Sequence, residues 1–187
     1  MGSGYFTNPL QFILGTIFSL YIAIVMLRFL FQLTRADFYN PLSQFIVKAT
    51  DPLLKPLRRL IPGWGGIDVA SIVLMIVLQM LATTILFAIV SKPLAPWPLF
   101  VVSLSELTSL LFNIYIYGII ILAIISWINP GTYNPVVSLI QTLTEPVMRP
   151  VRNVIPPMSG LDLSPLFVIL GLVVIKMLVL PLFGLLL

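Results

Sequence analysis

Long apolar runs separated by shorter polar segments dominate the chain. Four of these runs approach or exceed the ~20 residues that an α-helix needs to cross the hydrocarbon core of a bilayer. They cover residues 10–33, 69–90, 107–128 and 163–187. The pattern predicts an all-α integral membrane protein with four transmembrane helices. We expect the first run to be a retained helix, because neither the preceding Lys or Arg nor the following A-x-A site of a signal peptide is found.

The connections between the runs differ in length and in charge. Residues 34–68 and 129–162 form two long connections that hold seven of the ten bases, whereas the short connection, residues 91–106, holds only Lys92. Lys and Arg accumulate in cytoplasmic loops of membrane proteins. The bias therefore predicts that both long connections are cytoplasmic and that both termini lie outside.

An amphipathic helix is predicted in each long connection. Asn40–Pro41 and Asn134–Pro135 each place a capping residue before a proline suited to the first helical position. The expected apolar faces are Leu42, Phe45, Ile46 and Ala49, and Val136, Leu139, Ile140 and Leu143, with Ser43, Gln44 and Lys48 on the opposite side of the first helix. Two placements stay open: a helix lying in the headgroup plane and a helix folded back onto the spans, since both bury the same face.

A proline-rich segment, DPLLKPLRRLIP, follows the first amphipathic helix at residues 51–62. Asp51–Pro52 resembles a second cap and start. Pro56 has no N–H for the carbonyl one turn earlier, so a regular helix from Pro52 is not expected. Pro62 should end the segment, because residues before proline avoid the α region. The prediction is a kinked wedge with its bases, Lys55, Arg58 and Arg59, facing outward.

The same segment recurs later in the chain. A stretch that begins at Tyr39 matches one that begins at Tyr133, at an offset of 133 − 39 = 94 and without gaps. The matched pairs include Pro52/Pro146, Pro56/Pro150, Arg58/Arg152, Pro62/Pro156, Gly66/Gly160 and Asp68/Asp162, while Asp51/Glu145 and Lys55/Arg149 keep their charge. We therefore predict two tandem repeats, residues 1–92 and 93–187. Each repeat crosses the membrane twice, so the two share one orientation.

Asp68 and Asp162 each precede the second span of a repeat. A capping role is one interpretation, because each follows a glycine-containing turn. Pairing with Arg58 and Arg152 is the other. Both can hold together, since a capping carboxylate has lone pairs left over for an arginine.

These motifs resemble a known family. RADFYNP, DPLLKPLRRLIP, GGIDVAS, SWINP, TEPVMRPVRNVIPP and GLDLSP are similar to motifs of the YggT family of bacterial membrane proteins, in its form with two tandem copies. The resemblance implies a protein of the bacterial cytoplasmic (inner) membrane with relatives in plastids. It also implies cell-envelope or division-related roles and, in plastids, assembly of membrane complexes, without a settled biochemical activity. SWINP departs from the repeat, since the first copy reads FQLTRADFYNP.

Composition excludes most catalytic chemistry. The chain has no Cys and no His, which removes thiol chemistry, disulfides, Cys/His zinc sites and a Ser-His-Asp triad. Only 9% of residues are charged, against about 25% in soluble domains. No phosphate-binding loop, metal-ligand cluster or nucleophile motif is found. We expect no enzyme activity, catalytic residue, metal or cofactor. The bases lie beside spans, which favours anionic lipid over nucleic acid.

Four intramembrane polar residues remain. Arg28 lies near the cytoplasmic end of its span, so snorkelling would account for it. Lys176 lies about halfway along the fourth span, where a charged lysine costs about 2.5–3.5 kcal/mol, and we predict a contact with Glu106. Gln79 is expected to form interhelical hydrogen bonds.

The sequence supports two main functional interpretations. The first is a non-enzymatic scaffold or assembly factor whose lipid- and partner-binding residues are Lys55, Arg58, Arg59, Arg149 and Arg152. Its partners would be anionic lipids and a membrane or cytoplasmic protein. The alternative is a small channel or transporter subunit with a path lined by Lys176 and Gln79. A protein that organises lipid without a protein partner also stays open, as does a homo-oligomer.

Overall fold

The computed structural model describes residues 4–90, 94–128, 134–155 and 162–187. Within these ranges the chain forms six α-helices and no strand assigned as an element. They are α1 (Gly4–Leu33), α2 (Pro41–Leu60), α3 (Val69–Ile89), α4 (Pro96–Ile128), α5 (Pro135–Val154) and α6 (Ser164–Gly184). The helices α1, α3, α4 and α6 are long and apolar enough to cross a membrane. The predicted all-α class with four spans is confirmed.

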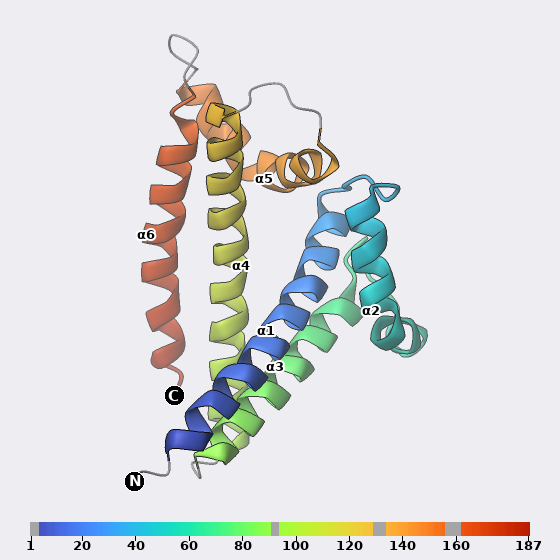
Figure 1. Cartoon of the computed structure of the whole chain (residues 1–187), viewed down its shortest axis with the longest axis vertical. Coiled ribbons are helices and arrows are strands. Elements are labelled where there is room, and N and C mark those ends of the chain that lie inside the picture. Colours follow the sequence, from blue (N-terminus) through green and yellow to red (C-terminus); the bar gives the residue numbers. More distant parts are fainter. Residues whose placement is uncertain (1–3, 91–93, 129–133, 156–161) are drawn as a thin grey trace.

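The four long helices form two pairs (Figure 1). Helix α1 packs against α3, α4 packs against α6, and α3 against α4 joins the pairs. Both α2 and α5 lie at the end of the molecule where α1 and α4 finish, while the end of α6 lies at the opposite end. The two repeats are therefore parallel, as the even number of spans in each requires.

The third span begins earlier than the apolar pattern predicts. Helix α4 starts at Pro96, and the Leu99 N–H already bonds to the carbonyl of Ala95. Prolines are tolerated in a first helical turn, whose N–H groups have no partner within the helix. Glu106, the last residue of the predicted short connection, lies inside the helix instead.

Both amphipathic helices run through their internal prolines. Helix α2 is continuous across Pro52 and Pro56, and α5 is continuous across the equivalent Pro146 and Pro150. The helix break expected at Pro52 and Pro56 is therefore wrong, and so is the same break at Pro146 and Pro150 in the second copy of the wedge. In Figure 1 the ribbon of α2 changes direction along its length instead. The predicted kink remains in α2, but without a helix end.

Contacts with the spans explain how helices with internal prolines persist. An interior proline removes one backbone hydrogen bond and costs about 3 kcal/mol, which the packing of an amphipathic face on its neighbours can offset. In α2, donors from α1 also reach backbone carbonyls just before the first internal proline: the Tyr21 hydroxyl bonds to Ala49 and Arg28 bonds to Val47. A neighbouring helix can thus satisfy backbone groups near a proline.

The amphipathic helices fold back onto the spans of their own repeats. Helix α2 packs against α1 and α3, and α5 packs against α4 and α6. The buried face of α2 consists of Ser43, Ile46, Thr50 and Leu54. The predicted face is wrong in part, because Ser43 is buried and Phe45 is exposed. The predicted face relied on apolar residues alone, but the small polar Ser43 and Thr50 are turned inward. Thr50 satisfies its hydroxyl within the helix by bonding to the carbonyl of Ile46.

Local signals at the helix starts are confirmed. The side chains of Asn40 and Asn134 accept hydrogen bonds from the N–H groups of Leu42 and Val136. Helix α2 ends at Leu60, before Pro62. Gly65 and Gly66 then adopt φ of 60° and 82°, values that favour glycine, in the tight turn before Asp68. Of the second copy, Pro156 and Gly160 lie outside the described residues.

Candidate functional site

Asp68 is both a helix cap and an ion-pair partner. Its Oδ2 lies 2.5 Å from Nη2 of Arg58, and its carboxylate also accepts hydrogen bonds from the N–H and hydroxyl of Ser71. The Asp68 side chain is only 4% exposed. The two interpretations of this residue therefore hold together, and the pair ties the end of α2 to the start of α3.

The second repeat contains the equivalent pair with an added acid. Arg152 Nε lies 3.1 Å from Oδ2 of Asp162, whose carboxylate also accepts from the Ser164 N–H. Arg152 Nη1 lies 3.1 Å from Oε2 of Glu145. The pair between an arginine at the end of the amphipathic helix and an aspartate before the next span is thus common to both repeats.

Asp51, the counterpart of Glu145, has different partners. It lies 2.8 Å from Nη1 of Arg28 and 2.8 Å from Nζ of Lys55. The Arg28 side chain is 9% exposed and also donates to Thr50. Arg28 therefore does not snorkel to the surface. The reason is tertiary, since folding α2 back onto α1 brings a carboxylate to the arginine and buries the guanidinium, while Asp51 stays partly exposed.

Neighbouring groups lower the pKa of three aspartates outside the spans. A hydrogen bond from Lys55 is the main cause at Asp51, with Arg28 adding to it. Burial alone would raise the pKa of Asp68, but hydrogen bonds from Arg58 and Ser71 outweigh it. Burial is likewise outweighed at Asp162, by bonds from Ser164 and Arg152. All three side chains therefore favour the charged form at neutral pH.

The predicted lipid- and partner-binding cations divide into two groups. Lys55, Arg59 and Arg149 are exposed on α2 and α5. Arg58 is directed toward Asp68 and is only partly exposed, whereas Arg152 pairs with Asp162 and stays exposed. The prediction that Lys55, Arg58 and Arg59 all face outward is therefore wrong for Arg58, because Asp68 at the start of the next span attracts it.

Gln79 forms the interhelical hydrogen bond that was expected, whereas Lys176 has a different partner from the predicted Glu106. Lys176 Nζ lies 2.7 Å from Oδ1 of Asn113, joining α6 to α4. Gln79 Nε2 lies 3.1 Å from Oε2 of Glu106, joining α3 to α4. The predicted Glu106–Lys176 contact is replaced by these two bonds. Because α4 starts at Pro96, Glu106 and Asn113 occupy different turns of the same helix, and each reaches a different neighbour.

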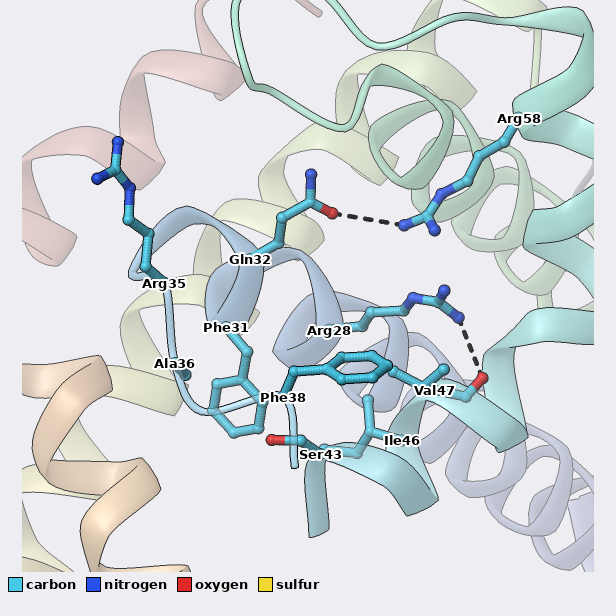
Figure 2. Close-up of a pocket in the computed structure, with 10 residues that line it drawn as sticks. All are labelled: Arg28, Phe31, Gln32, Arg35, Ala36, Phe38, Ser43, Ile46, Val47 and Arg58. Atoms are coloured by element: carbon cyan, nitrogen blue, oxygen red, sulfur yellow. Dashed lines mark hydrogen bonds between the residues drawn. The ribbon is translucent and has the colours of Figure 1, made fainter. Parts of the chain in front are cut away.

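A cavity of about 290 Å³ lies between the end of α1, the chain that follows it and α2. Ten residues line it: Arg28, Phe31, Gln32, Arg35, Ala36, Phe38, Ser43, Ile46, Val47 and Arg58. We call it the arginine cavity. In Figure 2, Arg28, Gln32 and Arg58 gather on one side, and the rings of Phe31 and Phe38 lie nearer Ser43.

Sequence reasoning missed this cavity. Arg28, Gln32 and Arg35 stand at i, i+4 and i+7, the spacing of one helical face, which was the available signal. Ser43 carried no such signal, since it was expected to face away from the spans. Within the described ranges, no three His, Cys, Asp or Glu side chains form a group that could hold a metal ion.

Four membrane-length apolar helices in two parallel repeats define a polytopic α-helical membrane protein. The CCB3/YggT family model matches residues 7–89 and 101–183, again at an offset of 101 − 7 = 94. The chain belongs to the CCB3/YggT family, which confirms the resemblance of its motifs.

Several curated relatives align over most of the chain. Uncharacterized protein PA0392 of Pseudomonas aeruginosa is 48% identical over 170 residues, covering 90% of this chain and 86% of the relative. A Vibrio alginolyticus protein described as uncharacterized, in the proC 3′ region, is 41% identical, with 88% and 90% covered. Uncharacterized protein YggT of Escherichia coli K12 is 37% identical, with 91% and 88% covered. No solved structure matches the chain.

Proposed function

We propose that the protein is a non-enzymatic scaffold or assembly factor of the bacterial cytoplasmic membrane. In this proposal α2 and α5 lie at the cytoplasmic surface, contact anionic lipid and bind a membrane or cytoplasmic partner protein. Both termini are then outside.

One observation carries the proposal: exposed cations and exposed apolar side chains occur together on α2 and just after it. Lys55 and Arg59 are exposed on α2, and so are Phe45 and Leu60 of the same helix and Trp64 just after it. Such a surface suits the headgroup layer, where apolar side chains reach toward acyl chains and cations meet phosphate. Family membership supports a membrane role without specifying a partner.

The two amphipathic helices are close enough to act as one surface. Asn40 Nδ2 lies 2.7 Å from the carbonyl oxygen of Pro135, joining the start of α2 to the start of α5. A partner that contacts both repeats would therefore meet two helices held in a defined relation. This favours a binding platform over two independent lipid anchors.

Site-specific photocrosslinking in intact membranes tests the proposal. Leu60 and Val154 are equivalent positions at the ends of α2 and α5, and they are 79% and 80% exposed. A photoreactive residue at either position should crosslink the same protein, while one at the exposed Tyr117 of α4 should not. Crosslinking should weaken in Lys55→Gln/Arg59→Gln/Arg149→Gln protein. Only lipid adducts from both positions would contradict the partner-binding role.

A further inference from the structure

The arginine cavity has the chemistry of an anion site. Its ten lining residues include three arginines and no acidic side chain. The partners of Arg28 and Arg58, Asp51 and Asp68, do not line it. Guanidinium groups bind phosphate and carboxylate oxygens through paired N–H donors. Asp51 and Asp68 balance the charges of Arg28 and Arg58 from outside the cavity, whereas Arg35 forms no ion pair with a described residue. The lining therefore offers guanidinium donors, one of them uncompensated in charge, and no acid that would repel an anion.

Hydrogen-bonding capacity is left over inside the cavity. The three bonds of Arg28 to α2 are all donated by Nη1, so its Nε and Nη2 remain without a partner among the described residues. The hydroxyl of Ser43 is buried and has no hydrogen-bond partner in the described structure. Buried polar groups are rarely left unpaired in native proteins. A bound ligand would supply the missing partners.

The second repeat shows that the fold does not need these groups. At the offset of 94, Arg28 corresponds to Leu122, Arg35 to Asn129 and Ser43 to Val137. By contrast, the Arg58–Asp68 pair recurs as Arg152–Asp162. Arg28, Arg35 and Ser43 are thus specific to the first repeat, whereas Arg58 belongs to the ion pair that both repeats share.

We propose that the arginine cavity binds the phosphate headgroup of an anionic phospholipid. Arg28 and Arg58 hold the phosphate, and Ser43 bonds to another headgroup oxygen. The exposed side chain of Arg35, whose guanidinium points away from both in Figure 2, turns toward the bound phosphate. A phospholipid suits the cavity better than a free anion because Phe31 and Phe38 form an apolar wall that inorganic phosphate would not use. A volume of about 290 Å³ accommodates a headgroup and not a whole lipid, so the acyl chains extend outside.

This inference rests on the proposed function, which places this end of the molecule in the headgroup layer, and it adds a specific lipid site. Native mass spectrometry of the intact protein, titrated with short-chain phosphatidylglycerol, measures the affinity. Phosphatidylcholine of the same chain length tests charge, and inorganic phosphate tests the free anion. Wild-type protein should bind one phosphatidylglycerol at least about tenfold more tightly than either control ligand, as charge-assisted bonds predict.

Matched variants are available from the second repeat. Arg35→Asn/Ser43→Val gives the first repeat the residues found at 129 and 137. Asn also suits the positive φ of 53° at Arg35. This double variant should bind phosphatidylglycerol at least about tenfold more weakly. Lys48→Thr removes one positive charge outside the cavity and copies Thr142. It should stay within about twofold of wild type, because the bonds to the phosphate remain.

Arg35→Asn alone serves as a second variant that should fold normally. Arg35 is exposed, so its replacement disturbs no buried packing. It should also weaken binding. Equal phosphatidylglycerol affinity in wild type and both cavity variants would overturn the inference, and so would binding of inorganic phosphate as tight as that of the lipid. Neither result would affect crosslinking from Leu60 and Val154. Failure of the lipid site and failure of the partner-binding role are therefore distinguishable.

Discussion

The buried carboxylate of Asp68 has two structural roles, as a helix cap and as an ion-pair partner. Its carboxylate caps α3 through Ser71 and neutralises Arg58 at the end of α2. Asp162 accepts from the Ser164 N–H and pairs with Arg152, but it stands one residue before Leu163, the N-cap of α6, and is more exposed than Asp68, 28% against 4%. Water can take the place of a lost partner more easily at the exposed Asp162 than at the buried Asp68. Breaking the ion pair should therefore cost more free energy of unfolding at Asp68.

We predict that Asp68→Asn lowers the free energy of unfolding by about 1–3 kcal/mol, the cost of leaving a buried polar group without its partner. The amide can still cap Ser71 but no longer neutralises Arg58. Asp162→Asn is the matched control and should cost less. Thermal unfolding of both proteins in detergent provides the comparison. Equal losses would mean that the difference in burial is irrelevant.

Stability should also fall in acid. The pKa values of Asp51, Asp68 and Asp162 are lowered in the folded state. The unfolded chain therefore binds protons first, from a pKa of about 3.9. The stabilisation is complete well above that pH and is lost as pH falls through the lower folded pKa values. Melting temperatures from pH 7 to 3 should drop more steeply in wild type than in Asp68→Asn. Melting temperatures that fall by the same amount in both proteins would show that ionised Asp68 is not a source of this stability.

The intramembrane pairs predict which double-mutant cycles show coupling. Lys176→Met with Asn113→Ala should couple by about 0.6 kcal/mol, typical of interhelical hydrogen bonds in membranes. Lys176→Met with Glu106→Gln should be additive within about 0.3–0.5 kcal/mol, because these residues have separate partners. Unfolding free energies of the singles and doubles test both statements. Strong coupling between Lys176 and Glu106 would instead support the direct contact predicted from the sequence.

At the scale of elements, α2 and α5 depend on close contact with the spans. A Cβ atom at Gly118 of α4 would lie 3.3 Å from Cγ2 of Ile140 and 3.4 Å from Cγ2 of Thr144, both on α5. These methyl groups belong to β-branched side chains, whose rotamers are restricted. Helix α5 can therefore approach α4 closely because residue 118 has no side chain.

We predict that Gly118→Ala destabilises the protein relative to Gly171→Ala. At Gly171 an added Cβ meets nothing within 4 Å. That substitution should gain up to about 1 kcal/mol from helix propensity. At Gly118 the steric contact should cancel the gain or reverse it. Thermal unfolding of the two variants decides this, and similar stabilisation of both would show that α5 shifts easily away from α4.

At the scale of the whole molecule, α3 and α4 join the two repeats into one bundle. Helix α6, in contrast, packs mainly against α4 and α5 and exposes most of its apolar surface. The bond from Asn40 to Pro135 and the contacts of α5 with α1 and α2 join the repeats again at the other end. The amphipathic helices therefore form part of the interface between repeats.

The proposed orientation predicts the accessibility of single cysteines, which the cysteine-free chain makes straightforward to introduce. Lys55→Cys should react only from the cytoplasmic side, and Ala95→Cys only from the outside, because both residues are exposed and the proposed orientation places α2 at the cytoplasmic surface and the start of α4 outside. A membrane-impermeant thiol reagent, applied to intact and to opened cells, measures both. The reverse pattern would invert the orientation. Ser43 is unsuitable as a reporter because it is buried.

The sequence by itself determined the class of protein, the spans, the tandem repeat and the helix starts at Asn40 and Asn134. These features depend on hydropathy over whole helices and on local backbone chemistry, which neighbouring residues in the chain decide. The continuity of α2 through Pro52 and of α5 through Pro146 was not accessible in this way. It depends on packing against the spans and, in α2, on donors from α1 that reach the carbonyls just before the proline.

Tertiary structure alone decided which polar groups meet. Arg28 looked like a snorkelling residue because its partner, Asp51, is on another helix. Ser43 looked outward-facing because apolarity was the only guide to the buried side of α2. Fold-back of α2 brings both residues to the arginine cavity with Arg35 and Arg58. Pairing at a distance in the chain depends on how helices pack, and hydrophobic periodicity carries no information about which polar side chains that packing brings together.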